Sequence, residues 1–329
     1  MTSTTTSNTT RRSVLITGAA GYLGKLLCDE LCRDPRGFGR IVASDVREAA
    51  GELPEAIAFE KLDIRDGEAL GRIVETYEID TIVHLAAVVT PPPGMSDEVA
   101  YAIDVEGTRN VLEACVAGGV RKVIVTSSGA AYGYHADSRA LLDEDCPLRG
   151  NDEFAYSRHK RLVEELLLEY RREHPELEQL VLRPGTILGP SVKNQITAIF
   201  ERPVVLGLRE AATPFCFVWD RDVVACLLAG VHGDHSGVFN VSGEGVMTLR
   251  EIAERLGKRY VALPASVVRG ALSALARLGL TRLGPEQVRF LQYRPVLDAS
   301  RLRQLGVFPA SSREAFEIYC AGRQEQTHA

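Results

Sequence analysis

The amino-acid sequence predicts a doubly wound α/β fold, in which helices cover both faces of one parallel sheet. Short β-branched runs alternate with helical patterns through the first half of the chain. These runs are almost continuously apolar, which is typical of parallel strands buried on both faces. Because parallel strands are joined by right-handed crossovers, the alternation places helices on both sides of the sheet. The later part of the chain predicts a smaller, mainly helical C-terminal lobe.

The predicted elements follow one another regularly as far as Pro184. Strands are expected at residues 14–17, 41–44, 59–62, 81–85, 122–126 and 180–182, with one more at 238–241. Helical patterns cover residues 22–33, 68–77, 99–117 and 153–173, and later 249–256, 265–278, 285–292 and 311–319. Between Pro184 and the last strand, glycine and proline interrupt the pattern, so we expect the smaller lobe to begin there.

Composition and charge narrow the class of protein. Of the 329 residues, 45% are hydrophobic and 25% are charged, as in ordinary globular domains. The net charge of −6 gives no basic surface for nucleic acid. No apolar run reaches the roughly 18 residues that a membrane-spanning helix needs. The seven cysteines include no CxxC pair, so we expect no metal site and a reducing, cytoplasmic compartment.

The first predicted strand runs directly into a glycine-rich turn, Gly18-Ala19-Ala20-Gly21-Tyr22-Leu23-Gly24, and then into a helix. Glycines at this spacing allow a tight turn and close approach of the backbone to a pyrophosphate, which the N-terminus of the helix then faces. The motif therefore predicts a dinucleotide site, and we expect its contacts to include Gly18, Gly21, Tyr22, Leu23 and Gly24. The fold is then a Rossmann fold. We expect a disordered tail at residues 1–12, an NAD-binding domain at 13–185 and a mainly substrate-binding lobe at 186–329. Some segments of this lobe are expected to return to the sheet.

Acidic residues end the second and third predicted strands. Asp45 can accept hydrogen bonds from the adenosine ribose hydroxyls. Its charge would repel a 2′-phosphate, which favours NAD over NADP, although Arg47 could reach a phosphate and Asp45 could instead form a turn. Asp63, next to Ile64, could contact the adenine or could cap the following turn.

Tyr156 and Lys160 lie four residues apart on one face of a predicted helix. A tyrosine that acts as a base near neutral pH needs its pKa lowered by about 3 units. One ammonium group nearby supplies an effect of about that order, so Lys160 is expected to lower the pKa of Tyr156. Tyr156 could then accept a proton from an alcohol while a hydride leaves to the cofactor. The alternative is a surface tyrosine beside a solvated lysine.

Ser128 follows the predicted strand at residues 122–126. A hydroxyl at the carboxyl end of a central strand lies where α/β sheets bind their ligands. Ser128 could polarise the substrate oxygen, or it could merely cap the end of the strand. No GxSxG surrounds it, so a serine-hydrolase site is not expected.

Together these residues resemble the extended short-chain dehydrogenase/reductases, often called the NAD-dependent epimerase/dehydratase family. The resemblance covers about residues 13–320. It is carried by Asp45 and by TGAAGYLG (17–24), LDIRD (62–66), VHLAA (83–87), TSSGAAYG (126–133), YSRHK (156–160) and RPGTILGP (183–190).

The resemblance implies roles for particular residues. It makes Tyr156 the acid/base, with Ser128 as its hydroxyl partner, and it lets Lys160 hold the nicotinamide ribose. It also implies cofactor contacts on two loops. The first loop lines the adenosine with Ala86, Ala87 and Val88. The second approaches the nicotinamide amide with Pro184 and Thr186. Family dimers often pair the helices that correspond to residues 99–117 and 153–173, so we expect a homodimer.

The chain departs from the family pattern at several positions. Gly129-Ala130 replaces the Asp-Glu of the dehydratases, which makes sugar dehydration unlikely. Asp104 replaces a common asparagine on the fourth helix, and its carboxylate lacks the hydrogen-bond donor that asparagine adds to the supporting proton relay. Phe215 stands where nucleotide-sugar epimerases usually have an arginine for the diphosphate, and Arg289 and Arg294 are the nearest later arginines.

Three functions remain open on the sequence. The first is a nucleotide-sugar epimerase, which oxidises a ring alcohol and returns the hydride, and the resemblance slightly favours it. The second is a net NAD-dependent dehydrogenase or ketoreductase that acts on a substrate without a nucleotide. Apolar residues of the helix at 265–278 could line the pocket of such an enzyme, although core packing explains these residues better. The third is a non-catalytic NAD-binding regulator, against which the intact Tyr156/Lys160 pair argues.

Overall fold

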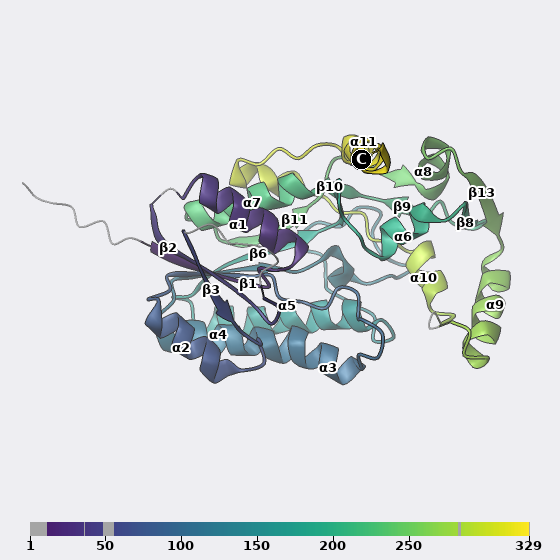
Figure 1. The fold of residues 1–329 in the computed structure, drawn as a ribbon. Coiled ribbons are helices and arrows are strands. Elements are labelled where there is room, and N and C mark those ends of the chain that lie inside the picture. Colours follow the sequence, from purple (N-terminus) through teal and green to yellow (C-terminus); the bar gives the residue numbers. More distant parts are fainter. Residues whose placement is uncertain (1–11, 36, 49–55, 282–283, 329) are drawn as a thin grey trace, which may run out of the picture.

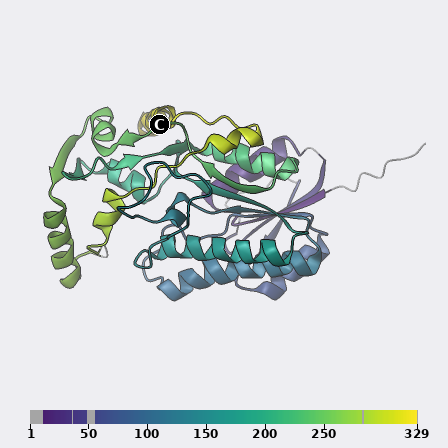
Figure 2. The ribbon, with the colours of Figure 1, turned by 180° about the vertical axis from the view of Figure 1, so that it is seen from behind.

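The computed structural model describes residues 12–35, 37–48, 56–281 and 284–328, and it confirms the predicted doubly wound α/β fold. A central parallel sheet lies between two layers of helices, and a smaller region rich in helices extends from one end of the molecule (Figure 1). The view from behind shows the same three layers (Figure 2).

The central sheet has seven strands in the order β11-β6-β5-β4-β1-β2-β3. Every neighbouring pair in it is parallel. The strands are β1 (Arg12–Thr17), β2 (Phe38–Asp45), β3 (Ile57–Lys61), β4 (Thr81–His84), β5 (Lys122–Thr126), β6 (Glu178–Pro184) and β11 (Gly237–Val241). The chain reverses direction across the sheet between β1 and β4, and the crevice outside such a switch point is where doubly wound sheets bind ligands.

Side chains of the strands alternate between two hydrophobic cores. On β1, Val14 and Ile16 pack with α1 (Tyr22–Arg33) and α7 (Asp220–His232). Leu15 points to the opposite face and packs under the other layer of helices. That layer consists of α2 (Gly67–Thr76), α4 (Gly107–Gly118) and α5 (Ala155–Glu173). Because both faces are covered, the strands carry apolar side chains at nearly every position, as predicted.

Several details differ from the sequence prediction, and three of them lie in or beside the main sheet and its helices. The helix expected at 99–117 consists of α3 (Asp97–Tyr101), a π-helical turn η1 (Ala102–Glu106) and α4. Helix α7 was not predicted, and it covers the sheet beside α1 although it lies late in the chain. Arg12, which we assigned to the tail, begins β1, and the remainder of that predicted tail, residues 1–11, lies outside the described residues.

The C-terminal region is mainly helical, as predicted. An aromatic core holds it together, in which Phe200 contacts Phe215, Phe217 and Phe316 edge-on. Its helices and strands are β7 (Thr186–Leu188), α6 (Gln195–Glu201), β8 (Val204–Leu208), β9 (Pro214–Phe215), β10 (Phe217–Trp219), β12 (Met247–Thr248), α8 (Leu249–Arg255), β13 (Arg259–Leu263), α9 (Ala265–Arg277), α10 (Gln287–Gln292), the 3-10 turn η3 (Ser300–Leu305) and α11 (Ser312–His328).

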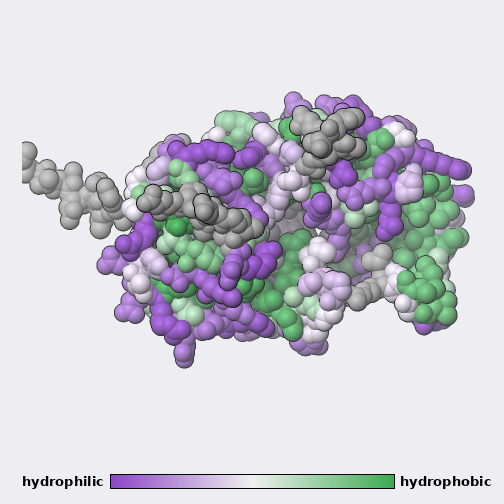
Figure 3. All heavy atoms as spheres, in the orientation of Figure 1, coloured by the Kyte–Doolittle hydropathy of each residue, from purple (hydrophilic) through white to green (hydrophobic). Residues whose placement is uncertain are grey.

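Helix α9 lies at the outer end of this region and presents apolar side chains to solvent (Figure 3). Val267, Leu275 and Leu278 are exposed on it, whereas Val268 and Leu272 pack beside a small core. None of these five residues lines the cavity described below, so the idea that this helix forms an apolar substrate pocket is not supported. Across the described residues, no helix is both long and apolar enough to span a membrane.

Candidate active site

The glycine-rich turn after β1 packs tightly against the loop that follows β4. Gly18 has a φ of 69°, and a Cβ built on it would lie 2.6 Å from the backbone nitrogen of Ala86. A Cβ on Gly24 would lie 2.5 Å from the carbonyl oxygen of Gly18. Both positions therefore require glycine, and the turn leads directly into α1. The hydroxyl of Tyr22, the first residue of α1, donates a hydrogen bond to Asp220 at the start of α7.

Asp45 ends β2 beside this turn and is buried. Its Oδ2 atom accepts a hydrogen bond of 3.0 Å from the backbone N–H of Ala20. Its Oδ1 atom accepts 3.0 Å and 3.2 Å hydrogen bonds from the backbone N–H and the Nε of Arg47. The carboxylate is thus fixed next to the glycine turn, with the arginine as its charge partner.

Asp63 and Ile64 follow β3 on the same side of the sheet. The side chain of Asp63 pairs with Arg65, and these hydrogen bonds hold the pKa of Asp63 below its usual range. Ile64 is buried, and a Cβ added to Gly107 would lie 2.6 Å from its side chain. Ile64 therefore fixes the start of α4 against the loop after β3.

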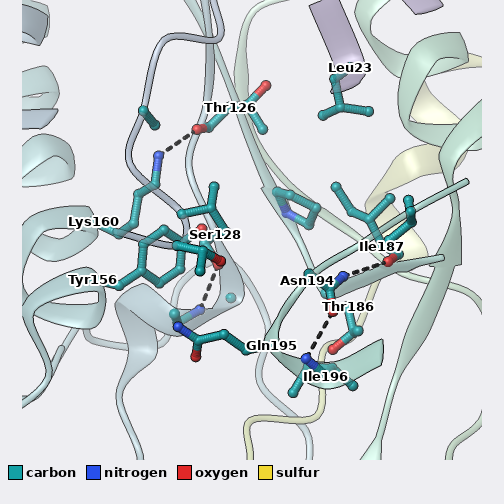
Figure 4. A pocket seen from close by; sticks show the side chains of 18 of the residues that line it. Leu23, Thr126, Ser128, Tyr156, Lys160, Thr186, Ile187, Asn194, Gln195 and Ile196 are labelled. Atoms are coloured by element: carbon teal, nitrogen blue, oxygen red, sulfur yellow. Dashed lines mark hydrogen bonds between the residues drawn. The ribbon is translucent and has the colours of Figure 1, made fainter. Parts of the chain in front are cut away.

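The predicted catalytic residues lie together where β5 ends and α5 begins. Ser128 precedes a 3-10 turn, η2 (Gly129–Tyr132), and its Oγ accepts a 3.1 Å hydrogen bond from the backbone N–H of Ala130. Lys160 is buried and donates a 3.0 Å hydrogen bond to the carbonyl oxygen of Thr126. Its Nζ lies 5.8 Å from the centre of the Tyr156 ring. Figure 4 shows Ser128, Tyr156 and Lys160 side by side on one wall of the pocket.

The pKa of Tyr156 differs from the sequence expectation. Burial raises it to about 12, the charge of Asp104 also raises it, and the hydrogen bond with Ser128 has the opposite effect. Burial also lowers the pKa of Lys160, which weakens the cation that was expected to favour the tyrosinate. In the protein by itself, removal of the tyrosine from water therefore outweighs the neighbouring ammonium group.

Asp104, in the π-helical turn η1, contacts α5, the helix that carries Tyr156 and Lys160. Its Oδ1 atom accepts a 2.7 Å hydrogen bond from the backbone N–H of Val88, as an asparagine oxygen would. Its Oδ2 atom lies 3.0 Å from Nδ1 of the buried His159. Aspartate lacks the N–H donor that an asparagine would have here. The imidazole of His159 compensates for this loss, because it donates a hydrogen bond to the carboxylate of Asp104.

A buried polar cluster fixes α5 to the sheet directly below the site. Arg183 on β6 pairs with Glu164 on α5, with Nε–Oε distances of 2.8 and 3.0 Å. The Ser127 hydroxyl donates a 2.5 Å hydrogen bond to the same carboxylate. Arg183 also donates to the hydroxyl of Tyr132, and its pKa is raised by Glu164. This pairing was not predicted, because its members come from separate elements of the chain.

The glycine turn and the group of Ser128, Tyr156 and Lys160 border one cavity of about 550 Å³. The predicted site residues in its lining come from the glycine turn and α1, the loops after β4 and β5, α5, and the end of β6 with the start of β7: Gly18, Gly21, Tyr22, Leu23, Gly24, Ala87, Ser128, Tyr156, Lys160, Pro184 and Thr186. The other predicted contacts lie outside the lining: Asp45, Asp63, Ile64, Ala86 and Val88. The opposite wall comes from the second half of the chain, where Thr186, Ile187 and Asn194 face the catalytic residues (Figure 4).

Phe215 and Arg294 form a contact that the sequence did not predict. Phe215 is completely buried in the aromatic core. An arginine in its place would therefore lie in this core and would not face a ligand. The guanidinium of Arg294, which follows α10, instead lies 4.1 Å from the centre of the Phe215 ring and borders the cavity. The two residues are far apart in sequence, and no local pattern connects them.

The cavity fits a dinucleotide. The glycines keep side chains out of the turn, so its backbone borders the cavity directly, and the N-terminus of the helix that follows suits a pyrophosphate there. Asp45 lies on one side of that turn, where the adenosine ribose of NAD would bind. Lys160 lies on the other side, where the nicotinamide ribose would bind. When bound, NAD supplies the group that accepts or returns a hydride.

Comparisons with known proteins agree with this geometry. Residues 14–242 match the model of the NAD dependent epimerase/dehydratase family. An uncharacterized protein of Mycobacterium tuberculosis is 26% identical over 317 residues, covering 94% of this chain and 84% of the relative. UDP-glucose 4-epimerase 2 of Oryza sativa is 30% identical over 225 residues, which are 61% of this chain and 53% of the relative.

A solved structure shows the same fold over the whole chain. The UDP-glucose 4-epimerase of Thermotoga maritima, crystallised with UDP-glucose, superposes with a TM-score of 0.73 at 22% identity, covering 96% of this chain and 100% of that one. The family model covers well over half of the chain, and it includes the glycine turn and the Ser128, Tyr156 and Lys160 positions. This chain is therefore a member of the NAD-dependent epimerase/dehydratase family and an NAD-dependent enzyme of the extended short-chain dehydrogenase/reductase type.

Proposed function

We propose that the enzyme transfers a hydride between NAD and the carbon of a secondary alcohol or ketone, with Tyr156 as the acid/base. The observation that carries the proposal is the meeting of Ser128, Tyr156 and Lys160 with the glycine turn in one cavity. Tyr156 exchanges a proton with the substrate oxygen, and Ser128 hydrogen-bonds that oxygen and orients it. Lys160 holds the cofactor ribose and supplies positive charge beside Tyr156.

For the overall reaction we propose the nucleotide-sugar epimerase type. It oxidises a ring alcohol and returns the hydride to the other face of the ketone. The 30% identity with the Oryza sativa epimerase supports it. The absence of an acidic pair after Ser128, where Gly129 and Ala130 stand, argues against dehydration of the sugar.

A net dehydrogenase or ketoreductase is the second candidate, and the lining of the cavity favours it. Val89, Ile187, Val192 and Leu297 give the cavity an apolar character that suits a substrate without a nucleotide. The buried Phe215, where many epimerases have an arginine, points the same way.

One experiment tests the proposal and separates the two reactions. The purified enzyme is incubated with NAD and either UDP-glucose or a panel of simple secondary alcohols, and reduced nicotinamide is followed by its absorbance. An epimerase converts UDP-glucose to UDP-galactose without net release of NADH, whereas a dehydrogenase accumulates free NADH with its alcohol. If the enzyme does not bind NAD, or if Tyr156→Phe turns over as fast as the wild type, the proposed function is wrong.

The organisation of the chain completes the proposal. We propose that residues 13–185 form the NAD-binding domain and that residues 186–329 mainly bind substrate, with α7 and β11 returning to the sheet. We propose a homodimer through α4 and α5, where Leu168 of α5 is exposed. All seven cysteines are free thiols, which supports a reducing, cytoplasmic location.

A further inference from the structure

Arg294 presents a partly buried cation to the cavity, and no carboxylate among the described residues pairs with it. Its guanidinium lies between two aromatic rings, 4.1 Å from the centre of Phe215 and 4.5 Å from the centre of Phe290. Its Nη2 atom donates a 3.1 Å hydrogen bond to the hydroxyl of Thr186. Its Nε and Nη1 atoms are buried and find no hydrogen-bond partner in the part of the chain that the structure describes. Unpaired buried donors on a cation are costly, so their retention points to a ligand that pairs with them.

The charges that line the cavity are all positive among the residues that the structure describes there. They are Lys160, Lys193 and Arg294, and the described lining contains no aspartate or glutamate. This local excess of positive charge contrasts with the net charge of the whole protein, which is −6. Lys160 is already assigned to the catalytic group, which leaves Arg294 as the partly buried cation on the opposite wall.

Arg294 lies at the reacting end of the cavity. It is tied to Thr186, which directly follows β6 and its loop. The buried Tyr134 lies close enough to both Arg294 and Tyr156 that each affects its pKa, in opposite directions. A substrate whose oxygen meets Tyr156 therefore brings its neighbouring carbon atoms towards Arg294, and an arginine fork suits a planar carboxylate or a phosphate oxygen.

We propose that the substrate carries an acidic group, a carboxylate or a phosphate, close to the carbon that is oxidised or reduced, and that Arg294 binds this group. The inference rests on the proposed hydride transfer at Tyr156 and narrows its substrate class. Under the epimerase reaction the substrate is a sugar acid, and under the dehydrogenase reaction it is an apolar hydroxy acid or phosphorylated alcohol.

The test compares acidic and neutral probes on enzyme saturated with NAD, because NAD then occupies the anion site of the glycine turn. Calorimetry measures the affinity of UDP-glucuronate against UDP-glucose, and of benzoate and phenyl phosphate against benzyl alcohol. In at least one set, we expect the acidic probe to bind about tenfold or more tightly than its neutral counterpart, the worth of one charge-assisted contact. Benzoate and phenyl phosphate show which acid the site prefers.

Two variants and a matched control locate the effect. Arg294→Gln should abolish the preference for the acid and leave the neutral probe unchanged, and Arg294→Lys should keep part of it. Arg289→Gln, which removes a half-exposed arginine of α10 that pairs with Glu153, should change nothing. The wild-type comparison alone remains decisive if the Arg294 variants fold poorly.

Three outcomes would overturn the inference. The first is that no acidic probe binds better than its neutral counterpart, and the second is that the preference survives in Arg294→Gln. The third is that UDP alone loses as much affinity as UDP-glucuronate in Arg294→Gln, because Arg294 would then bind a nucleotide diphosphate. None of these touches the proposed hydride transfer, which fails instead if NAD does not bind or if Tyr156→Phe keeps its turnover.

Discussion

The Oδ2 atom of Asp104 and the Nδ1 atom of His159 lie 3.0 Å apart in a pair from which water is almost excluded. The pair joins the π-helical turn to the catalytic helix, and the charge of Asp104 raises the pKa of both Tyr156 and Lys160. Asp104 thus opposes ionisation of the tyrosine and keeps the lysine charged. An asparagine at this position would provide the hydrogen bond to Val88 without either electrostatic effect.

Replacing Asp104 with asparagine should therefore lower the pKa of Tyr156 from about 12 towards its ordinary value. The sign follows because removal of a negative charge makes the tyrosinate less unfavourable. The ultraviolet absorbance of tyrosinate, with Tyr156→Phe as the background to subtract, measures this titration. His159→Gln keeps the charge of Asp104 and serves as the control. An unchanged Tyr156 titration in Asp104→Asn would show that Asp104 acts on the site only as a structural support.

Tyr156→Phe should reduce turnover by about 10²- to 10⁴-fold, the usual contribution of general acid–base catalysis. Its affinity for NAD, measured by calorimetry, should remain nearly unchanged. In the wild type, alcohol oxidation should accelerate as pH rises towards the pKa of Tyr156, because only the deprotonated tyrosine accepts the proton. The variant should lack this pH dependence. Lys160→Ala should impair both NAD binding and turnover. If it affects turnover alone, Lys160 does not contact the cofactor ribose.

The Arg183–Glu164 pair should control stability. Glu164→Gln leaves the buried Arg183 without its counter-charge, so the free energy of unfolding should fall by about 3–5 kcal/mol. Urea denaturation followed by circular dichroism measures this loss. Glu165→Gln removes the neighbouring carboxylate, which is half exposed and pairs with Arg161, and should cost only about 0–1 kcal/mol. Equal losses in the two variants would mean that the buried pair has no special role.

The sequence predicted the sheet and the cofactor turn well because both depend on local patterns. Apolar runs of β-branched residues identify buried strands, and the glycine spacing identifies the turn at Gly18. Helix α7 was missed because its apolar run directly follows the short strand β10, and such a run has no clear period. Strands β8 and β13 were missed because they pair only with each other across a long stretch of chain.

The substrate wall of the site was harder to predict for a different reason. Arg294 gains its significance from Phe215, Phe290 and Thr186, which come from three separate segments and meet only in the folded chain. The break in the helix expected at 99–117 has a similar origin. The π-helical turn places Asp104 against Val88 and His159, and these tertiary contacts outweigh the helical pattern of the segment.

We expect the choice between NAD and NADP to depend on Asp45, which lies buried beside the glycine turn. NAD offers this carboxylate two ribose hydroxyls, and each charge-assisted hydrogen bond contributes about 1.5–3 kcal/mol. The 2′-phosphate of NADP loses these bonds and adds repulsion, but Arg47 already contacts Asp45 and can turn towards a phosphate. We therefore expect NAD to be preferred by about 2–4 kcal/mol, and because of Arg47 we expect the low end of this range, about 30-fold tighter binding than NADP. Asp45→Ser should narrow this gap mainly by admitting NADP, with a smaller loss for NAD.

Calorimetric titration of both cofactors into the wild type and into Asp45→Ser measures the two affinities directly. Asp63→Ser is a matched control, because Asp63 follows the neighbouring strand β3 at this edge and also pairs with an arginine, Arg65. If Asp63 contacts the adenine, its loss should weaken NAD and NADP equally and leave their ratio unchanged. A wild type that binds NADP as tightly as NAD would mean that Asp45 does not face the adenosine ribose, and the cofactor would then lie differently along the sheet edge.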